Sequence, residues 1–155
     1  MKHVLIAIAM AAAAALTLLS CEKYDDGKPS KDVCSEFNKM YPGARDVEWE
    51  PEFGNWVVSF ETGTVPNVKE HEAWYDVAGN WLRTETDVRE SDLPKVVRDA
   101  LEASEYASPY LKIDDIDFVE TPDGEFYQVD VEVAGVEISL DVTTDGVISV
   151  SSLGI

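Results

Sequence analysis

The chain contains two copies of one structural unit, and this duplication constrains its fold more than any other feature of the sequence. Residues 71–77 (HEAWYDV) align without a gap with residues 136–142 (VEISLDV) and share the Glu, the Asp and the final Val. Each stretch leads into a tight-turn signal, Gly-Asn at 79–80 and Asp-Gly at 145–146. A repeat of this length indicates two similar supersecondary units packed against each other.

Each copy is expected to begin with a helix. A helical stripe of apolar residues runs from Lys31 to Tyr41 and ends at two helix breakers, Pro42 and Gly43. The second helix is expected to start near residues 91–94 (SDLP), where an acceptor side chain can cap the helix and the proline fits its first turn.

Four antiparallel strands are expected after each helix. The first pair of equivalent strands is 46–49 (DVEW) and 115–118 (DIDF). The second strands alternate large apolar residues with other residues, as strands buried on one face do. The aligned stretches follow as third strands, and residues 81–87 and 147–153 form the last ones.

The predicted fold class is therefore α+β. Two tandem helix-plus-four-strand repeats, at residues 31–90 and 91–155, would form one sheet of about eight strands. Each repeat has one apolar sheet face and one helix to cover it, so both helices are expected on the same face of the sheet and the other face is left bare.

Several turn and cap motifs resemble a known family. The motifs at residues 41–44 (YPGA), 92–94 (DLP), 124–129 (GEFYQV) and 141–146 (DVTTDG) are similar to those of the PepSY-like lipoproteins of Bacteroidetes. The resemblance implies a tandem β-lactamase-inhibitor-protein-like fold over nearly all of residues 31–155. It also points to relatives that bind or inhibit secreted peptidases and β-lactamases. Turns and caps specify a fold and not a function, and no inhibitory residue of those relatives can be matched here.

The first 20 residues are typical of a secretory signal. Lys2 precedes an apolar run from Val4 to Leu19, about 16 residues long, which is shorter than the roughly 20 that a membrane-spanning helix needs. A transmembrane anchor is the alternative. Residues 18–21 (LLSC) resemble the bacterial lipobox, which implies cleavage before Cys21 and lipidation of that residue.

A polar tether, residues 21–30, is expected between the lipid and the repeats because it contains Gly and Pro and no apolar periodicity. Glu22 differs from the Asp that resembles an inner-membrane retention signal, which favours the outer membrane. The acidic pair Asp25 and Asp26 resembles surface-export signals of Bacteroidetes lipoproteins, or it simply solvates the tether. We therefore expect a lipid-anchored envelope protein, on the periplasmic side of the outer membrane or on the cell surface.

The chain is strongly acidic. Without residues 1–20 it has 11 basic and 31 acidic residues, a net charge of −20. This charge repels a polyanion and excludes nucleic acid as a natural partner, whereas it suits a cationic partner, divalent metal ions, or simply a solvated surface. With Cys21 lipidated, no internal disulfide is expected for the other cysteine, Cys34, which falls on the apolar stripe of the first helix and is expected to be buried.

The bare sheet face is the candidate binding surface. Strict alternation places Ala73, Tyr75 and Val77 toward the helices, and it places their neighbours on the opposite face. In the next strand Leu82 is expected to be buried like Ile148. Clustered exposed aromatics are typical of interfaces. The alternative is that the two tryptophans on this face, Trp74 and Trp81, are covered by the tether, by a loop at 62–69 or through a twisted register. The predicted partner-binding residues are Trp74, Trp81, Val57, Glu72, Asp76 and Arg83.

A second candidate site is a weak calcium site in the second repeat. Residues 133–136 (VAGV) are typical of a two-residue hairpin, which would place Glu132 opposite Glu137, with Asp130 on the diagonal. A hard cation with oxygen ligands would relieve that repulsion. The alternative is that the three carboxylates point into solvent and repel weakly.

No catalytic machinery is evident. His71 is the only histidine after the signal, and its neighbours Glu70 and Glu72 point to the opposite strand face. The sequence has no zinc-ligand set, phosphate-binding glycine loop or nucleotide fingerprint. We expect a non-catalytic envelope lipoprotein that binds a protein or peptide partner, inhibitor-like in character, with no cofactor unless calcium binds. The alternative is a calcium-binding or calcium-responsive periplasmic protein, and the oligomeric state stays open.

Overall fold

The structure is a computed structural model, and it describes residues 28–107 and 112–151. The expected signal peptide, the lipidation site Cys21 and most of the tether lie outside the described residues. The elements are α1 (Lys31–Met40), β1 (Arg45–Glu52), β2 (Asn55–Thr64), β3 (Asn67–Tyr75), β4 (Trp81–Asp87), the 3₁₀ turn η1 (Glu90–Asp92), α2 (Lys95–Ala103), β5 (Lys112–Thr121), β6 (Gly124–Val133), β7 (Val136–Thr143) and β8 (Ile148–Val150).

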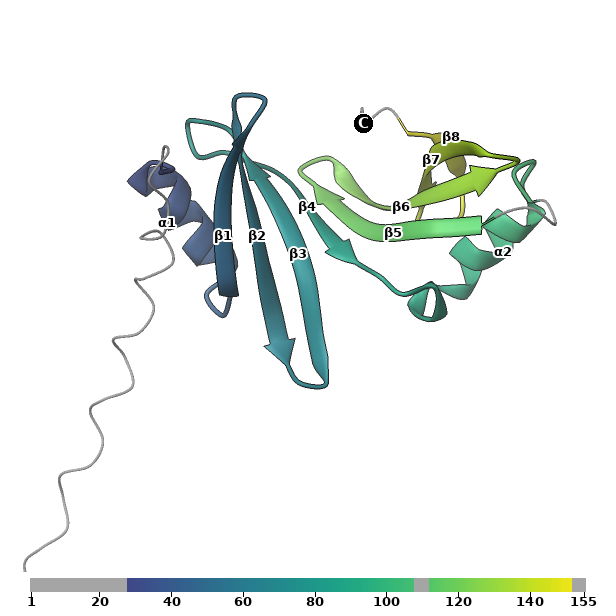
Figure 1. The fold of residues 1–155 in the computed structure, drawn as a ribbon, viewed down its shortest axis with the longest axis horizontal. Helices are drawn as coiled ribbons and strands as arrows, with labels where there is room; N and C mark the ends of the chain where they lie inside the picture. The colour runs from purple at the N-terminus through teal and green to yellow at the C-terminus, as the bar shows by residue number, and fades with distance from the viewer. Residues whose placement is uncertain (1–27, 108–111, 152–155) are drawn as a thin grey trace, which may run out of the picture.

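The strands form a single eight-stranded sheet in sequence order, and every neighbouring pair is antiparallel. The sheet is strongly twisted, so that β1, β2 and β3 run across β5 and β6 in the view of Figure 1. The first strand of each repeat has a register shift near its start, between Arg45 and Glu48 in β1 and between Ile113 and Asp115 in β5. The predicted α+β fold with one open sheet is confirmed.

Each repeat has its own apolar core, and both cores lie on the same face of the sheet. In the first, Val33 and Phe37 of α1 pack on β1, β2 and β3; in the second, Val97 and Leu101 of α2 pack on β5, β6 and β7. The face is continuous across the seam between the repeats, because Thr86 of β4 is buried there and pairs with Phe118 of β5. No described helix is long and apolar enough to cross a membrane.

The second helix starts differently from the expectation. The chain makes a 3₁₀ turn first, and α2 then begins after Pro94, whose N-cap position makes no side-chain hydrogen bond. Asp92 does not cap the helix because it lies in the 3₁₀ turn, two residues before the N-cap position; its carboxylate instead accepts from Arg89, with the Nη2–Oδ2 distance at 2.6 Å. By contrast, α1 begins as expected, with the Ser30 hydroxyl accepting from the Val33 amide.

Some residues expected to face the helices are exposed instead. Val77 is 69% exposed because β3 ends at Tyr75, which leaves Val77 in the turn before β4. Leu82 is 37% exposed because it is the extra residue of a β-bulge, where Trp74 pairs with Arg83 while Tyr75 pairs with Trp81.

Cys34 is buried, as expected. Contrary to expectation, however, it is disulfide-bonded in the structure.

Candidate binding face

The sheet face opposite the helices, which we call the open face, is not covered by either helix. Its residues follow from the cross-strand register of β2 to β6, since directly paired residues lie on the same face. The residues of this face include Val57, Ser59, Glu72, Trp74, Arg83, Glu85, Asp117, Val119, Gln128 and Asp130.

Trp74 is the aromatic side chain that the structure places on the open face in the first repeat. It pairs with Val57 of β2 on one side and with Arg83 of β4 on the other. The Arg83 guanidinium lies 4.0 Å from the ring centroid of Trp74, which is cation–π geometry. Trp74 remains half-buried, while Val57 is only 5% exposed. Four of the predicted residues therefore lie together here: Val57, Glu72, Trp74 and Arg83.

Trp81, predicted on the same face, lies on the opposite one. The bulge at Leu82 shifts the alternation by one residue, so Trp81 packs against the core beneath α1. Its indole Nε1 donates to the Thr84 Oγ1 at 2.8 Å, and the same hydroxyl is 2.6 Å from the Tyr41 Oη. Trp81 is thus a structural residue of the first repeat.

Asp76 is also not part of the open face. It lies just after β3, where its Oδ1 accepts from the backbone amides of Ala78 and Asn80 and its Oδ2 accepts from the Asn80 side chain. These hydrogen bonds hold the pKa of Asp76 below its usual value. Asp76 therefore shapes the β3–β4 turn.

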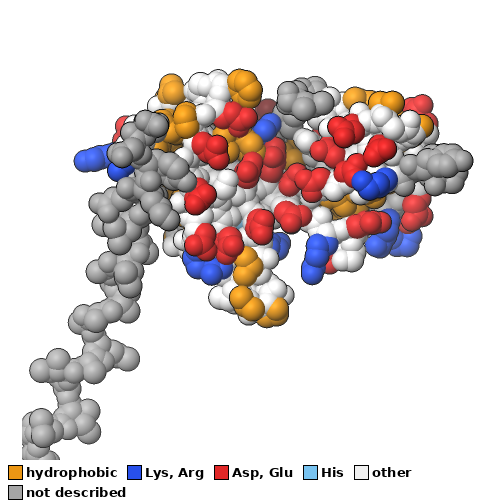
Figure 2. All heavy atoms as spheres, in the orientation of Figure 1, with side chains coloured by type: hydrophobic (Ala, Val, Ile, Leu, Met, Phe, Trp, Pro, Cys, Tyr) orange, Lys and Arg blue, Asp and Glu red, His pale blue; other side chains and the backbone are white. Residues whose placement is uncertain are grey.

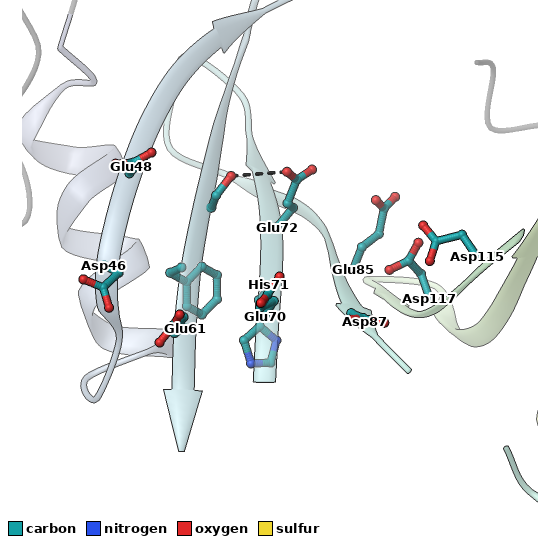
Figure 3. A pocket seen from close by; sticks show the side chains of 12 residues that line it. Asp46, Glu48, Glu61, Glu70, His71, Glu72, Glu85, Asp87, Asp115 and Asp117 are labelled. Carbon is teal, nitrogen blue, oxygen red and sulfur yellow. Dashed lines mark hydrogen bonds between the residues drawn. The ribbon is translucent and has the colours of Figure 1, made fainter. Parts of the chain in front are cut away.

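An acidic groove of about 640 Å³ lies on the open face, and Glu72, two residues before Trp74 in β3, is one of its lining residues. Its carboxylates come from β1 to β5, so both repeats contribute to it (Figure 3). Figure 2 shows acidic side chains spread along this side of the molecule. In the sequence, acidic residues alternate with other residues along strands of both repeats. The groove could not be predicted from this pattern, because the order of the strands in the sheet determines which acidic residues meet. The lining residues are Asp46, Glu48, Ser59, Phe60, Glu61, Glu70, His71, Glu72, Glu85, Asp87, Asp115 and Asp117.

Two carboxyls at the seam between the repeats are unusual. Burial raises the pKa of Glu85 to about 7, and the neighbouring Asp117 adds to this shift while Arg83 opposes it. Burial also raises the pKa of Asp117 to about 6, with repulsion from Asp115 and Asp87 as further causes. Arg83 Nε lies 3.0 Å from Glu85 Oε1, and no ion pair to Asp117 is found among the described residues. These two groove carboxyls therefore hold a proton more tightly than exposed carboxyls do.

The residues of the predicted calcium site are cross-strand neighbours. Glu132 pairs directly with Glu137, and Asp130 pairs with Ser139 next to them. Lys112 also pairs with Glu132, and its pKa is raised chiefly by its hydrogen bond to Asp114, with Glu132 and Glu137 contributing. Within residues 28–107 and 112–151, no three acidic, histidine or cysteine side chains converge as a metal site.

His71 is held on both sides of its ring. Its Nε2 lies 2.7 Å from the Thr62 Oγ1 and its Nδ1 lies 2.9 Å from the Thr86 Oγ1, while the ring stacks on Phe60 at 4.9 Å. Burial lowers the pKa of His71, so the neutral ring is favoured. The two threonine hydroxyls hold the ring between β2 and β4. Among the hydrogen bonds of the described residues, the imidazole has no carboxylate partner.

The family model described as "Putative beta-lactamase-inhibitor-like, PepSY-like" matches residues 54–149. No protein with curated annotation was found to match the chain. A structure from Bacteroides fragilis, described as a BLIP-like protein, has 27% identity and a TM-score of 0.70, covering 82% of this chain and 89% of its own. A DUF2874 family protein from Bacteroides ovatus has 27% identity and a TM-score of 0.69, covering 80% and 89%. A third, from Bacteroides eggerthii, is described as "putative periplasmic proteins" and shares the fold at 20% identity and a TM-score of 0.67, covering 79% and 86%.

Proposed function

The chain belongs to the beta-lactamase-inhibitor-like, PepSY-like family, and we propose that it is a non-catalytic protein that binds a protein or peptide partner on the open face of its sheet. The observation that carries the proposal is the geometry around Trp74. A half-buried indole under a guanidinium, beside a hollow, combines an aromatic anchor with polar groups, as interface hot spots do.

The groove sets the charge of the partner. Nine Asp and Glu side chains line it, its described lining includes no Lys or Arg, and the nearby Arg83 is already paired with Glu85. A partner with Lys or Arg at the contact would gain from this arrangement, and an acidic one would be repelled. The family description and the BLIP-like neighbour support an inhibitor-like role, in which the partner is a secreted enzyme.

The location follows from the signal and lipobox-like residues. Lipidation uses the thiol of Cys21 and therefore excludes a disulfide between Cys21 and Cys34 in the mature chain; it would anchor the repeats to the outer membrane, on the periplasmic side or the cell surface. The neighbour described as "putative periplasmic proteins" supports an envelope location. Globomycin treatment, which blocks processing of bacterial lipoproteins, should leave an unprocessed precursor; normal processing in its presence would contradict lipidation.

Affinity capture from an envelope extract tests the binding face. Wild type and Trp74→Ala are compared with Phe53→Ala, an exposed aromatic in the β1–β2 turn that is 97% exposed and not on the open face. A partner retained by wild type and by Phe53→Ala but lost from Trp74→Ala supports the proposal. Equal retention by all three variants contradicts it. The captured protein is then assayed for peptidase or β-lactamase activity with and without this chain.

The calcium alternative depends on one observation in the second repeat. Asp130 Oδ1 is buried without a hydrogen-bond partner, beside the facing pair Glu132 and Glu137. Lys112 competes with a cation for the same carboxylates. Thermal unfolding with millimolar Ca²⁺, compared with Mg²⁺ at matched ionic strength, tests it: a selective rise in the midpoint supports calcium binding, and equal midpoints exclude it.

A further inference from the structure

Two turns at one end of the first repeat expose apolar side chains. Phe53, in the β1–β2 turn, is 97% exposed, and Val77, in the β3–β4 turn, is 69% exposed, with Ala78 exposed beside it. Because the strands are antiparallel and follow one another in sequence order, these two turns lie at the same end of the sheet, the upper end in Figure 1. Hydrophobic side chains are also visible along the upper edge of the molecule in Figure 2. We call Phe53, Val77 and Ala78 the apolar rim.

The second repeat offers an internal comparison, because its corresponding turns are more polar. In the two-residue turns that close β1–β2 and β5–β6, residues 53–54 (FG) correspond to residues 122–123 (PD). In the turns that close β3–β4 and β7–β8, the same two backbone hydrogen bonds recur, so residues 77–78 (VA) correspond to residues 144–145 (TD). Val147, which follows the last of these turns, is exposed as a single valine. The apolar rim is therefore not required by the fold that the two repeats share.

Phe53 occupies a backbone conformation that its own side chain disfavours. Its φ is +46°, and Gly54 after it has φ +84°. Two-residue hairpin turns with both residues at positive φ favour Asn-Gly or Asp-Gly, and a bulky residue is rare at the first place. Since the ring is almost completely exposed, it gains nothing from packing within this chain. An aromatic ring held in this position indicates a contact outside the chain.

The rim lies at the end of the repeat from which the lipid anchor would leave. Gly79, in the β3–β4 turn, lies against the start of α1, since a Cβ on Gly79 would be 3.3 Å from the Val33 amide nitrogen. The helix begins at Lys31, directly after its N-cap Ser30. Ser30 is nine residues after Cys21, and even a fully extended chain of that length spans only about 30 Å. A lipid anchor on Cys21 would therefore hold this end of the repeat within about 30 Å of the bilayer.

We propose that the apolar rim contacts the lipid bilayer that holds the Cys21 anchor, with Phe53 and Val77 inserted among the lipid headgroups. This inference rests on the lipidation that is part of the proposed function. The strands of the first repeat would then lead away from the membrane, because the rim lies at their ends. The open face would stay in water, where a partner can reach it.

The short tether favours a bilayer over a soluble protein as the occupant of the rim. Two large apolar side chains bury too little area to hold either a protein or a bilayer from solution. The tether makes the contact with the bilayer intramolecular and so raises the effective concentration of the rim at the membrane surface, whereas a soluble protein gains nothing from the tether. A second copy anchored in the same membrane is the alternative, and it is one outcome of the test.

The charges near the rim favour zwitterionic headgroups. Lys31 and Asp32 at the start of α1 and Glu52 before the β1–β2 turn place both signs close to the rim. The net charge of the chain, −19, repels anionic lipids. The contact is therefore expected with phosphatidylcholine, and it should weaken when phosphatidylglycerol is added at low ionic strength.

Site-specific photo-crosslinking to lipid tests the inference. The mature lipoprotein, with p-benzoylphenylalanine placed singly at position 53, 77, 123 or 144, is purified from membranes and placed in nanodiscs of phosphatidylcholine. Positions 123 and 144 are matched controls in the corresponding turns of the second repeat. After irradiation, mass spectrometry is expected to find phosphatidylcholine adducts at positions 53 and 77 with a yield roughly fivefold above that at the two controls, because only the rim is held at the bilayer.

The variant Phe53→Asn provides the second measurement. Asparagine suits the left-handed backbone at this place, so the midpoint of thermal unfolding should not fall. In the nanodiscs, Phe53→Asn should lower the phosphatidylcholine adduct from position 77 by roughly threefold, because the rim loses its aromatic contact with the bilayer. The control Asp123→Asn should leave that adduct unchanged. An adduct from position 77 that Phe53→Asn does not reduce would contradict the insertion of Phe53.

The remaining outcomes are separable. Equal lipid adducts at all four positions, or none at positions 53 and 77, overturn the inference and leave lipidation standing. A protein dimer joined through position 53 without lipid adducts overturns it in favour of a second copy of this chain. Normal processing in the presence of globomycin removes the proposed lipidation, and the inference with it. The capture experiment with Trp74→Ala tests binding on the open face independently of all these results.

Discussion

Asp117 lies in the seam between the repeats, where it loses much of its water without gaining a cation. Its pKa in the folded chain, about 6, lies above the ordinary value of 3.8. The folded state therefore holds this proton more tightly than the unfolded state does. Its contribution to stability is fully present below about pH 4 and is lost as the pH rises through about 6.

Asp117→Asn is expected to stabilise the chain at pH 8 and to have little effect at pH 4. After allowance for the solvent that still reaches the group, we expect about 1 kcal/mol at pH 8, or roughly 3 °C in the midpoint. Thermal unfolding at the two pH values measures this. The same charge change at the exposed Glu125, as Glu125→Gln, should not show the pH dependence. A gain of equal size at both pH values would mean that burial of the charge is not the cause.

Among the elements, β4 shows where side-chain alternation in the sequence stops predicting which face of the sheet a residue occupies. The alternation in β2 and β6 correctly predicted which residues face the helices, because those strands are regular. In β4 a single bulge residue, Leu82, reverses the alternation before it, so Trp81 was assigned to the wrong face while Arg83 was assigned correctly. A bulge inserts one residue without a strong sequence signal. Assigning side chains to faces by alternation assumes that no residue is inserted, so one bulge reverses the assignment on one side of it.

The acidic groove could not be predicted for a different reason. Each strand shows its own acids in the sequence, but the groove arises only because β4 and β5 pair through residues 84–87 and 117–120 and so join the repeats edge to edge. The seam is formed by strand pairing between the two repeats. The similarity of the two repeats in sequence predicts only the strand pairs within each repeat. Duplication therefore predicted the fold class and left the site between the copies unspecified.

The end of the β2–β3 hairpin, residues 62–69, allows a prediction about stability at the scale of one element. Gly63→Ala should destabilise the chain more than Gly54→Ala, although both glycines have positive φ values, +80° and +84°. A Cβ at Gly54 meets nothing within 4 Å, so that variant loses only the roughly 1–2 kcal/mol of left-handed backbone strain. Gly63→Ala adds the collision with the Asn67 carbonyl. Urea unfolding measures the loss in free energy of unfolding for each variant. Equal losses would show that the end of the hairpin relaxes to make room for the added Cβ.

For the whole molecule, the dominant electrostatic term is self-repulsion. The chain has 31 acidic and 12 basic residues, and many of the acids share one side of the sheet. Surface ion pairs such as Lys95 with Asp99 and Lys39 with Glu36 are exposed, and each contributes at most about 1 kcal/mol. Compaction therefore brings far more like charges together than it satisfies with opposite ones.

Salt should consequently stabilise this chain. Raising NaCl from about 10 mM to about 300 mM shortens the screening length from about 30 Å to less than 8 Å, which removes repulsion across the sheet while it weakens only a few exposed ion pairs. We expect the midpoint of thermal unfolding to rise by several degrees at pH 8, and by less at pH 4, where many carboxylates are protonated. Choline chloride at the same concentrations should give the same rise, since screening depends on ionic strength and not on the identity of the cation. A fall in the midpoint with salt would mean that the few ion pairs outweigh the repulsion, and a rise with sodium alone would point to bound cations in the groove.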